Sequence, residues 1–153
     1  MAKSEFVYVT FIRTTPEKLW RALMEPEFTR QFWHDTAQEC DWKPGARWRI
    51  VKPDGSTADS GEVVEIDPPN KLVLQWQNQM FPEMTAEGFS RLTYQLEPKG
   101  DSVKLTLTHE MEKSDSKLIK AVSGGWPMIL SSLKSLLETG ESIEATRTWP
   151  EGM

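Results

Sequence analysis

The 153-residue sequence has a single cysteine, Cys40, and only two histidines. A lone cysteine forms no internal disulfide, and neither His-x-x-x-His nor Cys-x-x-Cys spacing occurs, so we expect no protein metal site and no cofactor. A glycine-rich phosphate-binding loop and the nucleophile elbow of hydrolases are also missing. These absences exclude the enzyme classes that short motifs identify, and we assign no residue to catalysis.

Long apolar runs and clusters of basic charge are scarce as well. No window approaches the roughly 18 apolar residues of a membrane span, and the first residues, "MAKSEF", lack the apolar stretch of a signal peptide. The formal net charge is −5, and the lysines and arginines are scattered. We therefore expect a cytoplasmic protein, with no membrane insertion and no nucleic acid as a partner.

Tryptophan, in contrast, is plentiful, with seven in a chain that is 38% hydrophobic and 27% charged. The length suits one domain with a single core. We expect residues 1–140 to form that domain. Residues 141–153 lack a strong pattern, so we expect a C-terminal tail whose composition is compatible with disorder.

The order of local patterns predicts an α+β protein. Residues 6–13 are β-branched and aromatic and favour a strand. A first short helix follows, capped by Thr15 with Pro16 in its first turn, and a second short helix is expected over residues 25–33. After residue 37 the apolar residues alternate with a period of two. The expected strands cover residues 39–42, 47–51, 60–66, 71–76, 89–98 and 102–111.

The last periodic segment predicts one long helix, from Trp126 to about Thr139, with a separate helical turn over residues 118–122 before it. Its apolar residues follow the i, i+3, i+4, i+7 spacing of a buried helix face; they are Trp126, Ile129, Leu130, Leu133, Leu136 and Leu137. We interpret Gly124 and Gly125 as a turn before this helix, with Pro127 in its first turn. Hairpin-length loops make the sheet mainly antiparallel, and its buried face needs this helix as a cover. We therefore predict a curved sheet of six or seven strands around the C-terminal helix.

Five motifs in this order carry a family resemblance. They are "TTPEKLWRALMEPE", "KPGARWRI", "GEVVEIDPPNKLVLQW", the pair "LTYQLEP" and "LTLTHE", and "GGWPMILSSLKSLLETG". Together they resemble the START-like or birch-pollen-allergen-like (SRPBCC) superfamily, which has the helix-grip fold. Within it, the chain looks like the bacterial branch related to the C-terminal domain of activators of the heat-shock-protein-90 ATPase.

This resemblance implies a cavity between the long helix and the sheet. Relatives use such a cavity for lipids, sterols, polyketides and other apolar molecules, whereas the activator relatives bind a chaperone through their surface. Strand alternation, the helix stripe and the apolar loop after residue 76 supply the candidate ligand-binding residues. They are Trp48, Trp76, Tyr94, Leu107, His109, Trp126, Leu130, Leu133, Met80 and Phe81.

Several of these residues have a second interpretation. The inward apolar side chains either line a cavity or fill a core. His109 is either a core histidine bonded to its surroundings, a ligand contact or a general base. The loop with Met80 and Phe81 is a lid, a partner surface or a small satellite core. His34 lies either at a pocket rim or in a solvated loop.

We expect the protein to bind an apolar small molecule, such as a lipid, polyketide or aromatic metabolite, as a carrier or sensor. The alternatives are a co-chaperone-like interaction module and an enzyme that acts on a ligand in the same cavity. A protein partner or a homodimer fits the second reading. A cavity smaller than about one drug-like ligand would contradict the first.

Overall fold

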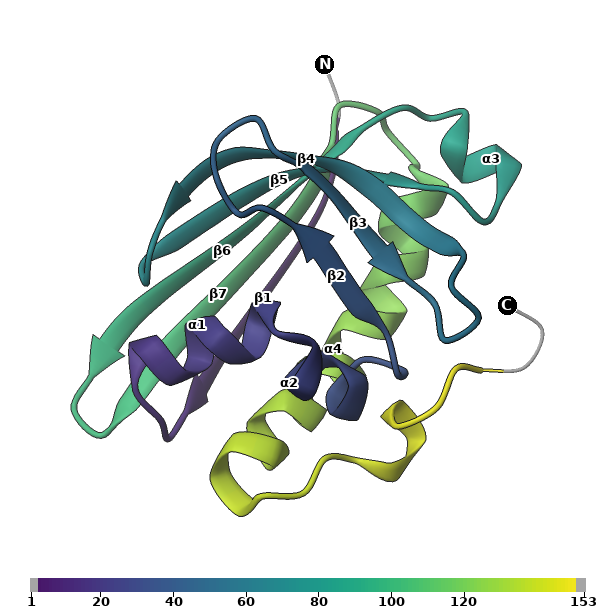
Figure 1. The fold of residues 1–153 in the computed structure, drawn as a ribbon. Helices are drawn as coiled ribbons and strands as arrows, with labels where there is room; N and C mark the ends of the chain where they lie inside the picture. Colours follow the sequence, from purple (N-terminus) through teal and green to yellow (C-terminus); the bar gives the residue numbers. More distant parts are fainter. Residues whose placement is uncertain (1–2, 151–153) are drawn as a thin grey trace.

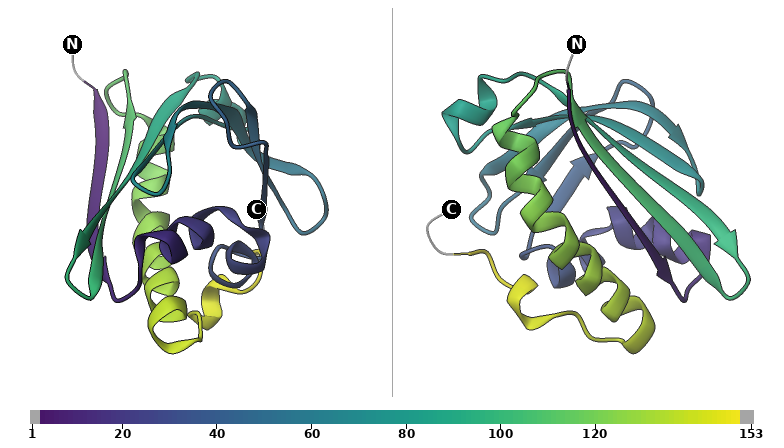
Figure 2. Two further views of the ribbon diagram at one scale, coloured as in Figure 1. Left: turned by 60° about the vertical axis from the view of Figure 1, so that its left-hand side comes forward. Right: turned by 180° about the vertical axis from the view of Figure 1, so that it is seen from behind.

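The computed structural model describes residues 3–150. Seven strands form one sheet in the order β1-β7-β6-β5-β4-β3-β2, and every neighbouring pair is antiparallel. The strands are β1 (Ser4–Ile12), β2 (Ala37–Cys40), β3 (Arg47–Val51), β4 (Thr57–Asp67), β5 (Lys71–Asn78), β6 (Ser90–Lys99) and β7 (Ser102–Met111). The sheet curves around a long C-terminal helix (Figures 1 and 2), so the predicted helix-grip fold is confirmed.

Three shorter helices surround that arrangement. They are α1 (Pro16–Met24), α2 (Pro26–Phe32) and α3 (Pro82–Thr85). Thr15 caps α1 as predicted, because its side chain accepts a hydrogen bond from the backbone N–H of Lys18. Helices α1 and α2 lie across the end of the sheet near the C-terminal half of the long helix, and α3 lies at the opposite end (Figure 1).

The long helix, α4 (Lys117–Thr139), begins before the expected glycine turn and runs through it without a break. Gly124, Gly125 and Pro127 therefore lie inside the helix, and the predicted glycine turn is wrong. Poor helix formers are tolerated here because tertiary packing outweighs local propensity. Most of the buried residues of α4 are apolar, from Leu118 to Leu136.

The N-terminus of α4 is capped twice, which explains its early start. Ser116 accepts a hydrogen bond from the backbone N–H of Ile119. Glu87, in the connection after α3, accepts bonds from the Ser116 hydroxyl and from the backbone N–H groups of Lys117 and Leu118. A carboxylate at a helix N-terminus also interacts favourably with the helix dipole. The α3 connection is thereby tied to the start of α4.

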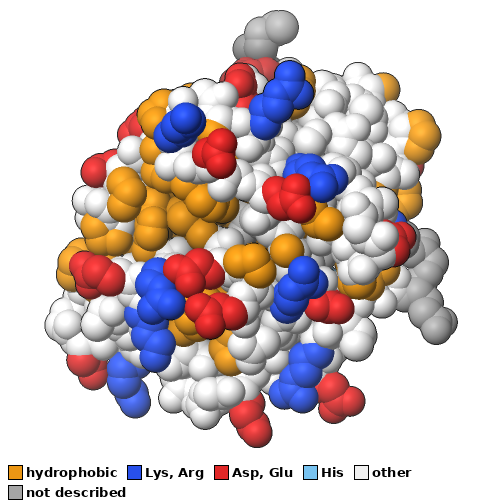
Figure 3. Space-filling model, in the orientation of Figure 1, with side chains coloured by type: hydrophobic (Ala, Val, Ile, Leu, Met, Phe, Trp, Pro, Cys, Tyr) orange, Lys and Arg blue, Asp and Glu red, His pale blue; other side chains and the backbone are white. Residues whose placement is uncertain are grey.

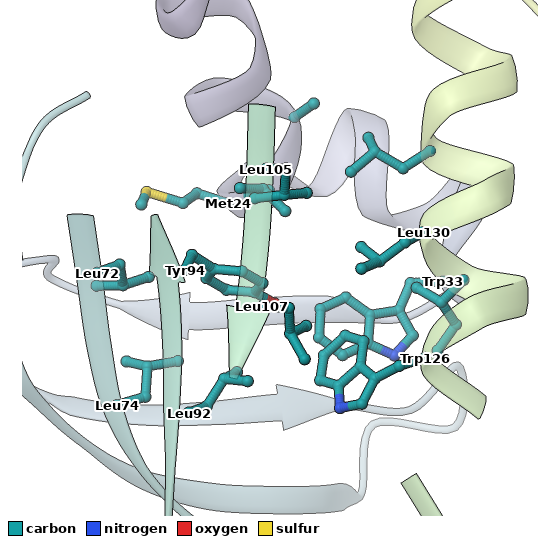
Figure 4. Packing of buried hydrophobic residues seen from close by; sticks show 14 of the residues in the cluster. Met24, Trp33, Leu72, Leu74, Leu92, Tyr94, Leu105, Leu107, Trp126 and Leu130 are labelled. Atoms are coloured by element: carbon teal, nitrogen blue, oxygen red, sulfur yellow. The ribbon is translucent and has the colours of Figure 1, made fainter. Parts of the chain in front are cut away.

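The core fills the space between the concave face of the sheet and α4. Tyr94 and Leu107 project from neighbouring strands towards the helix, and Leu130 projects back from α4 (Figure 4). All three side chains are buried, as strand alternation and the helix stripe predicted.

The described part of the C-terminal segment, residues 141–150, returns along α4. Thr146, in a short 3₁₀ helix (η1, Glu144–Thr146), is fully buried, and its hydroxyl lies 2.7 Å from that of Ser132 on α4. Its carbonyl accepts the backbone N–H of His34, and the carbonyl of Thr148 accepts the His34 Nδ1–H. The division of the chain at residue 140 stays a prediction, but residues 141–150 pack against α4 and the segment after α2.

Candidate functional site

Four tryptophans meet beneath the N-terminal half of α4. The ring centroids of Trp33 and Trp126 are 5.2 Å apart, and those of Trp76 and Trp126 are 5.8 Å apart. Trp48 lies 4.8 Å from Trp76 on the sheet side. These separations fall in the range where aromatic pairs attract each other beyond simple burial. The rings come from four elements or their ends, so this cluster joins the sheet, the α2 end and α4.

Three of these buried indoles donate their N–H to a buried polar side chain. Trp48 donates to Gln38, at 2.9 Å. Trp76 donates to Asp59 Oδ1 at 3.0 Å. Trp126 donates to His109 Nδ1 at 3.1 Å. Because an indole nitrogen only donates, each bond fixes the ring orientation and the acceptor's role.

The bond from Trp126 determines the state of His109. Nδ1 accepts, so the neutral ring carries its proton on Nε2, which lies 2.8 Å from the hydroxyl oxygen of Ser90. Ser90 in turn donates to the backbone carbonyl of Trp76 at 3.0 Å. Burial lowers the pKa of His109 to about 3. Both ring nitrogens are thus engaged in a closed network, which leaves neither for a general base.

Asp59 is the buried acid of this region. It lies on β4, and its Oδ1 accepts from both Trp76 and Asn78, the latter at 3.3 Å. Burial raises the pKa of Asp59 to about 7, against the smaller opposing effect of those two bonds. Its carboxyl therefore exchanges a proton near neutral pH.

A cavity of about 190 Å³ opens beside this cluster, between α4, the ends of β4 and β5, the α3 connection and the C-terminal segment. Most of its lining is apolar or aromatic, and Asp59 is the acidic residue among the described residues that line it. The lining residues are Trp33, His34, Thr36, Ile50, Ala58, Asp59, Trp76, Asn78, Met80, Phe81, Met84, Leu118, Ala121, Val122, Gly125, Trp126, Ile129, Trp149 and Pro150.

Gly125 helps to create this space. A Cβ atom added at Gly125 would meet no heavy atom within 4 Å, and the same holds for Gly124, which does not line the cavity. The absence of a side chain at Gly125 therefore leaves volume on the face of α4 that looks into the cavity.

Four of the ten candidate ligand-binding residues line this cavity: Trp76, Trp126, Met80 and Phe81. The other six do not line it and pack in the buried core; they are Trp48, Tyr94, Leu107, His109, Leu130 and Leu133. Their role in ligand binding stays a prediction. Met80 and Phe81 contribute to the lining, and so does His34.

Sequence reasoning missed Asp59 and Trp33 as site residues. The strand was expected to begin at residue 60, but β4 begins at Thr57. Alternate residues of a strand face the same side, so Gly61 and Asp59 share the inward face of Val63 if the strand is extended towards the N-terminus. The sequence pattern could therefore have predicted that Asp59 faces inward.

A second hollow, of about 850 Å³, lies on the outer face of the sheet. Charged side chains such as Arg47 and Glu62 line it, and the ring of Phe89 beside them is 52% exposed. Basic and acidic side chains are also interspersed across the face shown in Figure 3. Neither this hollow nor the face in Figure 3 is therefore a continuous patch of positive or negative charge.

Residues 13–138 match the family described as "Activator of Hsp90 ATPase homolog 1-like protein". The chain belongs to this family. The predicted branch of the START-like superfamily is therefore confirmed. A search of the curated proteins finds no match.

Solved structures show how widely this AHSA1-like fold is shared. The Mesorhizobium loti protein MLL2253 is 24% identical, with a TM-score of 0.74 over 88% of this chain and 97% of that one. The Aha1 dimer of Colwellia psychrerythraea is 19% identical, with a TM-score of 0.73 over 91% and 99%. CalU16 of Micromonospora echinospora is 19% identical, with a TM-score of 0.70 over 93% and 78%. At these identities the likeness shows the fold alone.

Within residues 3–150, no helix of this protein is both long enough and apolar enough to cross a membrane.

Proposed function

We propose that this AHSA1-like protein binds a compact, mainly apolar molecule, about one or two rings in size, in the cavity beside α4. The observation that carries this proposal is the cavity itself, with tryptophan walls and a carboxyl group, Asp59, in its lining. Ligand pockets typically combine apolar walls with a few polar groups that orient the ligand.

The volume restricts the ligand class. Pockets for drug-sized ligands occupy roughly 300–1,000 Å³, whereas this cavity has about 190 Å³. An engineered apolar cavity of about 150 Å³ holds benzene. The proposal therefore keeps the small aromatic metabolites of the sequence-based expectation and sets aside lipids and polyketides.

Binding is favoured over catalysis by the state of the polar groups. His109 is buried behind Trp126 with both ring nitrogens hydrogen-bonded. Asp59 is the remaining acid–base candidate, and general acid–base catalysis on one group needs a reacting partner placed beside it. A carrier or sensor role needs no such partner.

The test is a size series measured by isothermal titration and tryptophan fluorescence. Benzyl alcohol should bind and change the emission of the tryptophan cluster, while palmitate should not bind. Val122→Phe should block benzyl alcohol, because Val122 lines the cavity. Met128→Phe is the matched control, since Met128 lies on the same helix, is 46% exposed and is not part of the lining. Tight binding of palmitate, or no binding of any ring compound, contradicts the proposal.

A second candidate function is self-association through β1. Val7, Val9 and Phe11 are each 45–51% exposed along this edge strand, and one structural neighbour is described as a dimer. Isolated exposed apolar residues are ordinary, but three in one row suit an interface with a second copy. Sedimentation should give a dimer that Phe11→Ser shifts towards monomer; a monomeric wild type rules this candidate out.

A further inference from the structure

Asp59 stands in the cavity without a charge partner. Among the residues that the structure describes, no lysine, arginine or histidine forms an ion pair with it. Both of its hydrogen bonds converge on Oδ1, and Oδ2 has no hydrogen-bond partner among those residues. A buried carboxylate without a cation is costly. A cationic group entering the cavity would remove that cost.

The walls of the cavity favour the same kind of group. Trp33, Trp76, Trp126 and Phe81 all contribute to the lining, and the faces of such rings attract cations, most strongly when water is excluded. No lysine or arginine lines the described cavity, so its lining offers an anion no permanently charged partner.

We propose that the cavity selects a small organic cation, an ammonium group attached to an aromatic ring or a short alkyl chain, over a neutral molecule of the same shape. Asp59 pairs with the ammonium group through Oδ2, and the indole rings surround the rest of the ligand. This inference rests on the proposed function and specifies the ligand class for the same cavity.

The preference for a cationic ligand should depend on pH through the ionisation of Asp59. Asp59 has a pKa of about 7, so it is mostly ionised at pH 8 and mostly neutral at pH 5.5. The other titratable side chain in the described lining is His34, whose Nδ1 donates to the carbonyl of Thr148. Lys52 lies against Trp149, and His109 is bonded to Trp126 behind the wall. Bound benzylammonium should hold Asp59 in its ionised form and release a proton near pH 7.

The test compares benzylamine with benzyl alcohol, which differ in charge and match in shape. In isothermal titration at pH 8, benzylamine should bind at least about tenfold more tightly, as expected for a desolvated cation against a carboxylate and ring faces. Equal or weaker binding of benzylamine overturns the cation inference and leaves the proposed function intact. Binding of neither compound overturns both.

Two further measurements identify the group responsible. Asp59→Asn keeps an acceptor for Trp76 and Asn78 but removes the negative charge, so it should lose the preference for benzylamine over benzyl alcohol. In the wild type, the preference should decline as the pH falls from 8 to 5.5. His34→Asn, a change suited to the positive φ of 54° at this position, should leave that decline unchanged. A preference that survives Asp59→Asn, or that ignores pH, overturns the inference.

Discussion

The two neighbouring glycines of α4 offer a matched pair of substitutions that tests both the fold and the cavity. Gly124 and Gly125 lie inside one continuous helix, and an added Cβ atom meets nothing within 4 Å at either position. Only Gly125 lines the cavity. Gly124→Ala and Gly125→Ala therefore change the helix in the same way and the cavity differently.

The stability effect should be equal for both variants. Alanine inside a helix is favoured over glycine by about 0.5–1 kcal/mol. In a chain of this size, about 1 kcal/mol raises the melting temperature by about 2–4 °C. Urea unfolding and calorimetry measure both quantities. A loss of stability in both variants would show that these glycines turn the chain, as the sequence first suggested, and would refute the continuous helix.

The binding effect should separate them. One added methylene in a filled apolar pocket changes affinity by about 10–200-fold, or about 1–3 kcal/mol. With the largest aromatic probe that the wild type binds, Gly125→Ala should weaken binding by at least about tenfold, and Gly124→Ala should leave it unchanged. If both variants bind as the wild type does, the ligand does not occupy the space beside α4. If both alter binding equally, the glycines act through the helix backbone.

The remaining predictions concern single polar groups. Asp59→Asn should stabilise the fold, by an amount that grows by about 2–3 kcal/mol between pH 5 and pH 8, because its raised pKa makes ionisation at higher pH destabilising; an equal effect in urea unfolding at both pH values contradicts this. Glu87→Gln should lower the free energy of unfolding by about 1 kcal/mol at pH 7. Burial alone would raise the pKa of Glu87, but the bonds from Ser116 and the α4 backbone lower it, so this loss should vanish as the pH falls through that lowered pKa; a loss that persists in acid speaks against the cap. His109→Phe should free the indole N–H of Trp126 and so alter the near-ultraviolet circular dichroism of the tryptophans. In the wild type, this spectrum should depend little on pH above pH 5, because burial keeps His109 neutral there. A wild-type spectrum that titrates between pH 5 and 8 argues against the neutral histidine.

Much of the architecture was predictable because each strand has one buried face. Alternating apolar residues identified the inward side of β6 and β7, and Tyr94 and Leu107 are buried as expected. The apolar stripe after Trp126 likewise identified the buried face of α4. These patterns depend on local periodicity, which the sequence displays directly.

The site was less predictable because its features depend on tertiary packing. Gly125 and Pro127 argue locally against a helix, yet packing and the Glu87 cap continue α4 through both. Asp59 follows a turn-rich segment and is polar, so local propensity placed it outside a strand. The division of the inward tryptophans between cavity and core depends on where α3 and the C-terminal segment close, which no local pattern records.

Some walls of the cavity belong to the hydrophobic core and others to peripheral segments. This difference affects how the ligand specificity of such a protein can change. The aromatic cluster and its hydrogen-bonded partners belong to the core, so their substitution affects folding. Met80, Phe81, Met84 and Trp149 come from α3, the connection before it and the C-terminal segment, outside the sheet ladder and α4. These side chains are only partly buried, so substitution there can enlarge, reshape or close the cavity at less cost to the fold than substitution in the cluster. A helix-grip protein of this type can therefore acquire a new ligand by changes in its peripheral segments while Trp76 and Trp126 stay in place.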